Sequence, residues 1–299
     1  MAVVAAVDVW RWQPHPEVWA LLLGLIGLYA YAVRRIGPSA TLEGEPVVTP
    51  AQLRWFVATI VTLWVASDWP VHDIAEEHLY SAHMAQHLLL SLVVPPMALL
   101  ATPTWLARMV VGDGRGYRVV RWLTRLVPAT ILFNAVVVFS HWPLVVEASV
   151  TNPFAHYGVH LLVVTTGLIV WMGVCSPLPE LRFSLLVQAA HLFLQSVVPT
   201  VPAGILVFAE HVAYESYDRV GRIWGLTALE DQQLAATMMK LLAGTYLWVI
   251  IASLFIRFAN QSQADDRDRG IALDRRSPEL TWAQVERELA EAGPAPMEP

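Results

Sequence analysis

The chain has few charged residues and almost no cysteine or lysine. Only 15% of its 299 residues are charged, whereas 56% are apolar, and the apolar residues lie in long blocks. This composition excludes an ordinary soluble domain and is typical of a polytopic membrane protein. The single cysteine, Cys175, excludes an internal disulfide and any metal cluster built from cysteine.

Strand-like alternation of apolar and polar residues is also lacking. An unpaired strand cannot satisfy its backbone in lipid, so this lack argues against a barrel. Apolar runs of about 20 residues, which as helices cross a hydrocarbon core of about 30 Å, are present instead. They predict an all-α membrane protein, a bundle of seven transmembrane helices near 17–35, 51–67, 79–101, 127–146, 154–175, 184–209 and 234–258.

The arginines are distributed unevenly about these helices. With the N-terminus outside, fifteen arginines fall in the inner loops and the C-terminal tail, and three fall outside. Basic residues are in excess on the cytoplasmic side of membrane proteins. We therefore expect a multi-pass membrane protein with its N-terminus outside and its C-terminus inside. Asp8 and Arg11 interrupt the first apolar stretch, so we expect the first span to stay uncleaved.

The composition changes sharply after Phe258. Residues 1–258 are predicted to form the transmembrane domain, and residues 259–299 a polar cytoplasmic tail. Ser277 and Pro278 are typical of a helix start, which predicts a short helix over 278–292. A mostly disordered tail is the alternative interpretation.

Histidines are the feature that a membrane composition does not explain. His83 and His87 are four residues apart, as are His156 and His160, and His141 lies on the segment between the pairs. On a helix, side chains at this spacing share one face, with Cβ atoms about 5–6 Å apart. Because imidazole is costly in lipid without a partner, the pattern predicts a metal site.

The depth of these histidines supports a shared site. At about 1.5 Å per residue, all five fall in the outer half of the membrane. His72 and His78 lie at the mouth above them, His211 lies on the same side, and only His191 falls in the inner half. A lone transmembrane histidine usually makes an interhelical hydrogen bond, but histidines placed independently would occur at both depths.

The residue types narrow the choice of metal. Imidazole suits copper, zinc, iron or nickel, and a thioether nearby favours Cu(I). We expect Asp231 and Glu147 to attract the cation at the outer mouth, with solvated loop acids as the alternative. The predicted metal ligands are His83, His87, His141, His156 and His160, with Met84, His78, Asp231 and Met239 as auxiliary residues.

Several motifs resemble those of a known family. The run His83-Met84-Ala85-Gln86-His87-Leu88-Leu89-Leu90, followed by Pro95-Pro96, resembles the signature of the CtaG-like cytochrome c oxidase assembly factors. Phe139-Ser140-His141-Trp142-Pro143 before the second histidine pair is similar to the same family. So are Tyr214, Tyr217 and Leu229-Glu230-Asp231-Gln232-Gln233 with Met239. The resemblance covers about residues 50–258.

The resemblance implies a non-enzymatic role in the assembly of haem-copper oxidase, with a copper ion handled for the catalytic subunit. The implied partners are that subunit of cytochrome c oxidase and a copper donor protein, besides the lipid bilayer, with no nucleic acid. The chain departs from the family pattern at three places. Val159 stands where an acid is usual, Ala235 and Ala236 where glycines are, and Lys240 where tryptophan is.

Three other functions remain open from the residues alone. A di-iron oxidoreductase such as a desaturase also uses histidines at this spacing, but its histidine boxes face the cytoplasm. A haem-binding redox protein would take one histidine from each of two helices. A retinal protein would use Lys240, but this lysine lies only about two turns from the outer end of the seventh helix.

Overall fold

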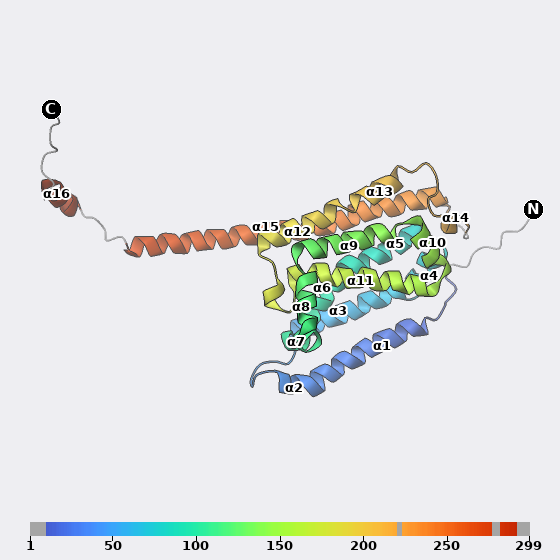
Figure 1. The fold of residues 1–299 in the computed structure, drawn as a ribbon, viewed down its shortest axis with the longest axis horizontal. Helices are drawn as coiled ribbons and strands as arrows, with labels where there is room; N and C mark the ends of the chain where they lie inside the picture. The colour runs from blue at the N-terminus through green and yellow to red at the C-terminus, as the bar shows by residue number, and fades with distance from the viewer. Residues whose placement is uncertain (1–9, 220–222, 277–281, 292–299) are drawn as a thin grey trace, which may run out of the picture.

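The structure is a computed structural model that describes residues 10–219, 223–276 and 282–291. Every regular element in these residues is a helix, and no strand occurs among them (Figure 1). The seven stretches predicted to cross the membrane are all helical: α1, η1 and α2 (Pro16–Tyr31, Ala32–Ile36 and Gly37–Ala40), α3 (Pro50–Ser67), α5, η2 and α6 (Tyr80–Leu88, Leu89–Val93 and Val94–Ala101), α9 (Leu126–Ser140), α11 (Pro153–Cys175), α12 and α13 (Leu185–Val197 and Thr200–Val207), and α15 (Ala228–Arg276).

Five of these stretches are long and apolar enough to cross a membrane: Pro16–Ala40, Tyr80–Ala101, Pro153–Cys175, Leu185–Val207 and Ala228–Arg269. A sixth span would combine α8 (Arg115–Leu123) with α9, which are bent by 74° at their junction. Over the residues that the structure describes, the protein is therefore an all-helical membrane protein with five or six candidate spans, and α3 is not among them.

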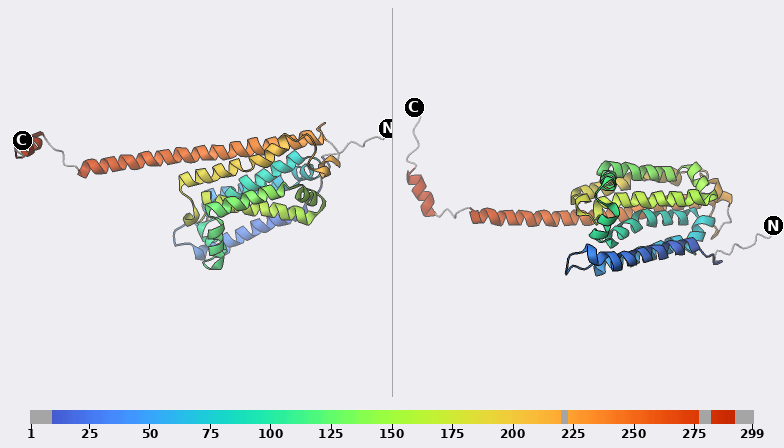
Figure 2. Two further views of the ribbon diagram at one scale, coloured as in Figure 1. Left: turned by 45° about the horizontal axis from the view of Figure 1, so that its top comes forward. Right: turned by 60° about the horizontal axis from the view of Figure 1, so that its bottom comes forward.

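The helices lie side by side in one bundle, with α1 along its edge and packed on α3 (Figures 1 and 2). Short helices gather at the end where α5 and α11 begin, namely α4 (Val71–Glu77), α10 (Pro143–Thr151) and α14 (Glu215–Arg219). At the opposite end lie α7 (Thr104–Val111), α8 and the short turn η3 (Pro179–Leu181). The histidine pairs belong to the first of these ends.

The last long helix continues well beyond the bundle (Figure 2). α15 has 49 residues and reaches Arg276, so the change in composition after Phe258 falls within one continuous helix. A separate helix, α16 (Trp282–Glu291), follows in the region where a short helix was predicted. The predicted start of that helix at Ser277 and Pro278 lies outside the described residues.

The fourth predicted span ends earlier than the sequence indicated. α9 ends at Ser140, and a new helix, α10, begins at Pro143. Proline has no backbone N–H to donate and is favoured at the first position of a helix, so it starts α10 rather than continuing α9. His141 therefore lies in the turn between two helices.

The helix that carries His83 and His87 widens into a π-helical turn, η2, just below them. Pro95 and Pro96 lack the N–H groups that would bond to Ser91 and Leu92. The Tyr246 hydroxyl donates to the freed Leu92 carbonyl at 3.1 Å. Such deviations are tolerated in lipid only where the freed groups find partners, and here a neighbouring helix supplies one.

Helix α11 packs closely on this widened turn at Gly167. A Cβ atom added there would lie 2.7 Å from the Ser91 carbonyl oxygen and 2.9 Å from Pro95 Cγ. The backbone at Ser91 cannot move without disturbing η2. The absence of a side chain at Gly167 therefore sets the distance between α11 and the helix that carries the first histidine pair.

We expect Gly167→Ala to destabilise the bundle by about 1–3 kcal/mol, the usual cost of overpacking. Gly158→Ala on the same helix is the matched control, since its Cβ would meet no described atom within 4 Å. Alanine at that exposed helical position should be neutral or slightly stabilising. Thermal unfolding of both variants in detergent tests this, and equal melting temperatures would contradict the close approach.

Candidate metal centre

Three histidines from two helices bring their ring nitrogens together. His83 and His87 lie on α5, with ring centroids 4.5 Å apart, and His160 from α11 lies 5.7 and 4.9 Å from them. Each offers one nitrogen, and these three atoms lie within 4.8 Å of one another. We call His83, His87 and His160 the inner group.

Side-chain caps fix the start of both helices. The Asn152 side chain accepts hydrogen bonds from the backbone N–H groups of Phe154 and Ala155 and so caps α11. α5 has its cap from a distant segment, since Asp231 of α15 accepts from Tyr80 N at 2.7 Å and Ser81 N at 3.1 Å. These caps satisfy N–H groups that a helix cannot satisfy itself.

The imidazole nitrogens at this site fit a metal ion. The Nε2 atoms of His87, His156 and His160 are buried, and no hydrogen-bond partner exists for them within the described part of the chain. Buried polar atoms without partners are rare because each costs free energy. Convergent imidazole lone pairs are suitable ligands for copper or zinc, so the site can hold such an ion.

His156 is one turn before His160, and their ring centroids are 4.1 Å apart. The ligand atom of His156 nevertheless lies in a different cluster of side chains from that of His160. His72 and Glu76 of α4 complete this second set, again with ligand atoms within 4.8 Å of one another. We call His72, Glu76 and His156 the outer group. Glu76 Oε1 lies 3.3 Å from Nδ1 of both His83 and His156, so it faces both groups.

Sequence reasoning placed His72 at the mouth of the site and did not single out Glu76 as a ligand. The signal was present, because His72 and Glu76 are four residues apart, like the two histidine pairs. It was not recognised because α4 has only seven residues and was not predicted as a helix.

The two α4 side chains of the outer group, His72 and Glu76, are in protonation states that can coordinate a metal ion. Burial alone would raise the pKa of Glu76, but contact with His83 and the nearby His156 outweighs it and lowers the pKa below its usual value. Burial also lowers the pKa of His72. Near neutral pH, Glu76 is thus an anion and His72 a neutral imidazole, which are the forms that coordinate metals.

His141 pairs with Met239 rather than with the other histidines. Its Nε2 lies 3.0 Å from the Met239 sulfur, and its Nδ1 lies 2.7 Å from the Val137 carbonyl oxygen. The carbonyl requires the proton to be on Nδ1, which leaves the Nε2 lone pair facing the thioether. A cavity of about 80 Å³ is lined by His141, Met239, Met84 and His87, so the pair faces the same space as one member of the inner group, His87.

Asp231, Glu147 and His78 are engaged away from the two metal-binding groups, whereas Met84 lines the cavity beside His87. Asp231 is fully buried and caps α5, and the Glu147 carboxylate accepts from the backbone N–H and hydroxyl of Ser216. Met84 packs with Tyr80 and Tyr214 in a buried cluster. His78 is buried, with Nε2 4.0 Å from Glu77, and belongs to neither metal-binding group.

His191 shows what a structural histidine looks like in this bundle. It is fully buried, with Nδ1 3.1 Å from the Thr130 hydroxyl and Nε2 3.3 Å from the Val170 carbonyl oxygen. Both ring nitrogens are therefore satisfied by neighbouring helices. The unpartnered nitrogens of the inner group contrast with this arrangement.

Comparison with known proteins assigns the family. The sequence profile of the cytochrome c oxidase caa3 assembly factors (Caa3_CtaG) matches residues 27–261. The chain belongs to this family. No curated protein and no solved structure gave a match. The matched part of this Caa3_CtaG protein contains the inner group, the outer group and the His141–Met239 pair, and it confirms the resemblance found in the motifs.

We expect Asp231→Ala to destabilise the protein by about 1–2 kcal/mol, because it removes the cap of α5. Asp231→Asn keeps one acceptor oxygen for the two N–H groups and should lie between wild type and alanine. Thermal unfolding of the metal-free protein measures this. Equal melting temperatures for the alanine and asparagine variants would show that Asp231 does not stabilise the protein through its hydrogen bonds to Tyr80 and Ser81.

Proposed function

We propose that this protein binds copper at the inner group and transfers it to the catalytic subunit of a haem-copper cytochrome c oxidase during assembly. The observation that carries the proposal is the convergence of buried imidazole nitrogens that lack partners among the described residues. Membership of an oxidase assembly family supports the choice of the oxidase as recipient. The role is non-enzymatic, since copper is cargo.

The donor set suits transfer. The inner group has three imidazoles and no carboxylate, and the His141–Met239 pair offers a thioether across the adjoining cavity. Nitrogen and thioether donors favour copper, and a thioether favours Cu(I) in particular. A carrier has to release its ion, and a site of few neutral ligands releases it more readily than a closed site of anionic ligands.

The orientation proposed from the arginines places the site on the outer side of the bacterial plasma membrane. The N-terminus is then outside, the C-terminal tail is cytoplasmic, and both groups lie under the outer surface. Copper delivered by an external donor protein would reach the end of the bundle where α4, α10 and α14 gather. The desaturase alternative would need its histidines on the other side.

Copper analysis of the purified full-length protein tests the site. We expect about one copper ion per chain to be lost when His83 and His87 are both replaced by alanine, because two of the three inner imidazoles are removed. His211→Ala is the matched control, since His211 is exposed and belongs to neither group. An unchanged copper content in the double variant would reject the site, and a Soret band in the wild type would indicate haem binding instead.

The same variants test the assembly role in cells. Deleting the gene should lower the copper content of the isolated oxidase, and the double histidine variant should fail to restore it while His211→Ala restores it. An oxidase with normal copper and haem in the deletion strain would argue against an assembly role, whatever the purified protein binds.

The thioether has a separate test. We expect Met239→Leu to weaken retention of Cu(I) about tenfold and to leave Zn²⁺ binding unchanged, because thioether ligands select Cu(I). Met238→Leu, one residue away and outside the cavity lining, is the control. Competition with a Cu(I) chelator measures the difference, and equal retention by the two variants would remove Met239 from the site.

A further inference from the structure

The outer group is a second set of metal-binding side chains, built differently from the inner one. His72 and Glu76 come from α4, which lies outside the candidate spans, and His156 comes from the first turn of α11. The Glu76 side chain is 23% exposed, against 5% for His156, so solvent reaches the group at its carboxylate. The outer group shares no residue with the inner group.

The two groups differ in chemistry. Two imidazoles and one carboxylate suit a divalent transition-metal ion, because the anionic oxygen is a harder ligand and offsets ionic charge. The inner group offers nitrogen alone. Glu76 Oε1 lies within 3.3 Å of Nδ1 of an inner histidine, His83, so ions held in the two groups would be neighbours with this carboxylate between them.

Surrounding residues hold the outer group in place. Gln86 of α5 is fully buried, and its Nε2 donates to the Ala66 carbonyl at 2.6 Å and lies 3.3 Å from His72 Nδ1. The His15 ring packs edge-on against the His72 ring at 4.7 Å. His72 is thus fixed by α5 on one side and by the N-terminal segment on the other.

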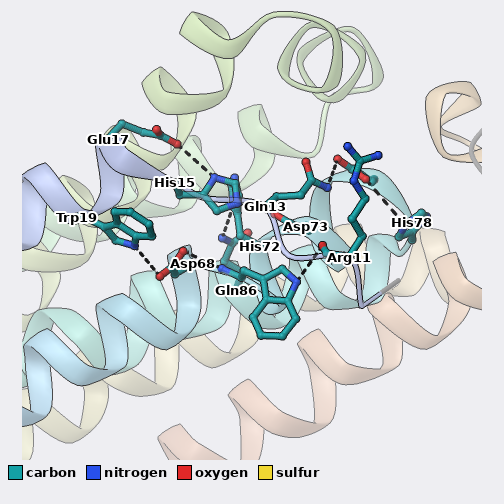
Figure 3. A network of polar contacts seen from close by, with 12 residues as sticks. Arg11, Gln13, His15, Glu17, Trp19, Asp68, His72, Asp73, His78 and Gln86 are labelled. Atoms are coloured by element: carbon teal, nitrogen blue, oxygen red, sulfur yellow. Dashed lines mark hydrogen bonds and ion pairs between the residues drawn. The ribbon is translucent and has the colours of Figure 1, made fainter. Parts of the chain in front are cut away.

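Several polar contacts connect the N-terminal segment to α4 and to the residues just before it (Figure 3). His15 Nε2 lies 2.6 Å from Asp73 Oδ1, Gln13 donates to Glu77 at 2.9 Å, and Trp19 donates to Asp68 at 2.9 Å. Three carboxylates, those of Asp68, Asp73 and Glu77, are thereby bonded to side chains of the N-terminal segment. These contacts also hold α4 against the bundle, with Glu76 facing inward.

We propose that His72, Glu76 and His156 form a second metal subsite, which receives a divalent transition-metal ion from the outer solution and adjoins the inner group. The inference rests on the proposed function, since it gives the copper site an outer receiving position. The protein then holds two metal ions per chain, one with a mixed imidazole and carboxylate set and one with imidazoles alone.

Metal stoichiometry tests the second subsite in the full-length protein in detergent, with Zn²⁺ and Cu²⁺ each used alone. Wild type should bind two ions per chain and Glu76→Gln one. His87→Asn combined with His160→Asn should also leave one ion. Glu77→Gln is the matched control, because this neighbouring acid contacts Gln13 rather than either group, and it should bind two ions. Thermal unfolding without metal checks that the variants are folded.

The electron paramagnetic resonance spectrum of Cu²⁺ gives a second readout. In the His87→Asn, His160→Asn variant, the remaining Cu²⁺ should show hyperfine coupling to two nitrogens, and adding Glu76→Gln should abolish binding. The subsite would be overturned if the wild type bound one ion and Glu76→Gln bound that ion 10–100-fold more weakly. Glu76 would then be an orienting partner of His83 and His156.

Two further outcomes separate this inference from the proposed function. If Glu76→Gln changes neither stoichiometry nor affinity, the second subsite is rejected while the inner copper site stands. If Glu76→Gln removes an ion but replacing His83 and His87 removes none, the outer subsite stands and the proposed inner site is rejected.

Discussion

The contact between Asp231 and the start of α5 is the interaction on which the site depends. A carboxylate with no exposed surface satisfies two backbone N–H groups of the helix that carries His83 and His87. Ala235 and Ala236, one turn further along α15, are also fully buried and let α15 approach α5 closely. The position of the first histidine pair is thus set by a helix about 150 residues later in the chain.

Much of the fold could be predicted because its causes are local. Long apolar runs predict helices wherever they occur, and each of the seven predicted stretches contains a helix, although only five or six are candidate spans. The spacing of His83 and His87 on one helix face likewise needs only the geometry of a helix. By contrast, the end of α9 was predicted six residues late, because composition does not show that Pro143 starts a new helix.

The grouping of ligands could not be predicted from local pattern, because it depends on how distant segments meet. Asp231 was expected to attract a cation and instead caps a helix across the bundle. His156 and His160 share one helix face, yet the structure groups one with α4 and the other with α5. Val159 supplies no carboxylate beside His160, and here Glu76 brings a carboxylate to the histidines from another element.

The continuity of α15 has a mechanical consequence. Its 49 residues at about 1.5 Å each make a rod of about 74 Å, more than twice a hydrocarbon core of about 30 Å. Asp231 and Met239 lie near one end of this rod, and the charged stretch up to Arg276 lies at the other. A helix without a break transmits rotation along its axis, so a torque on the projecting part would act on the cap of α5 and on the thioether beside His141.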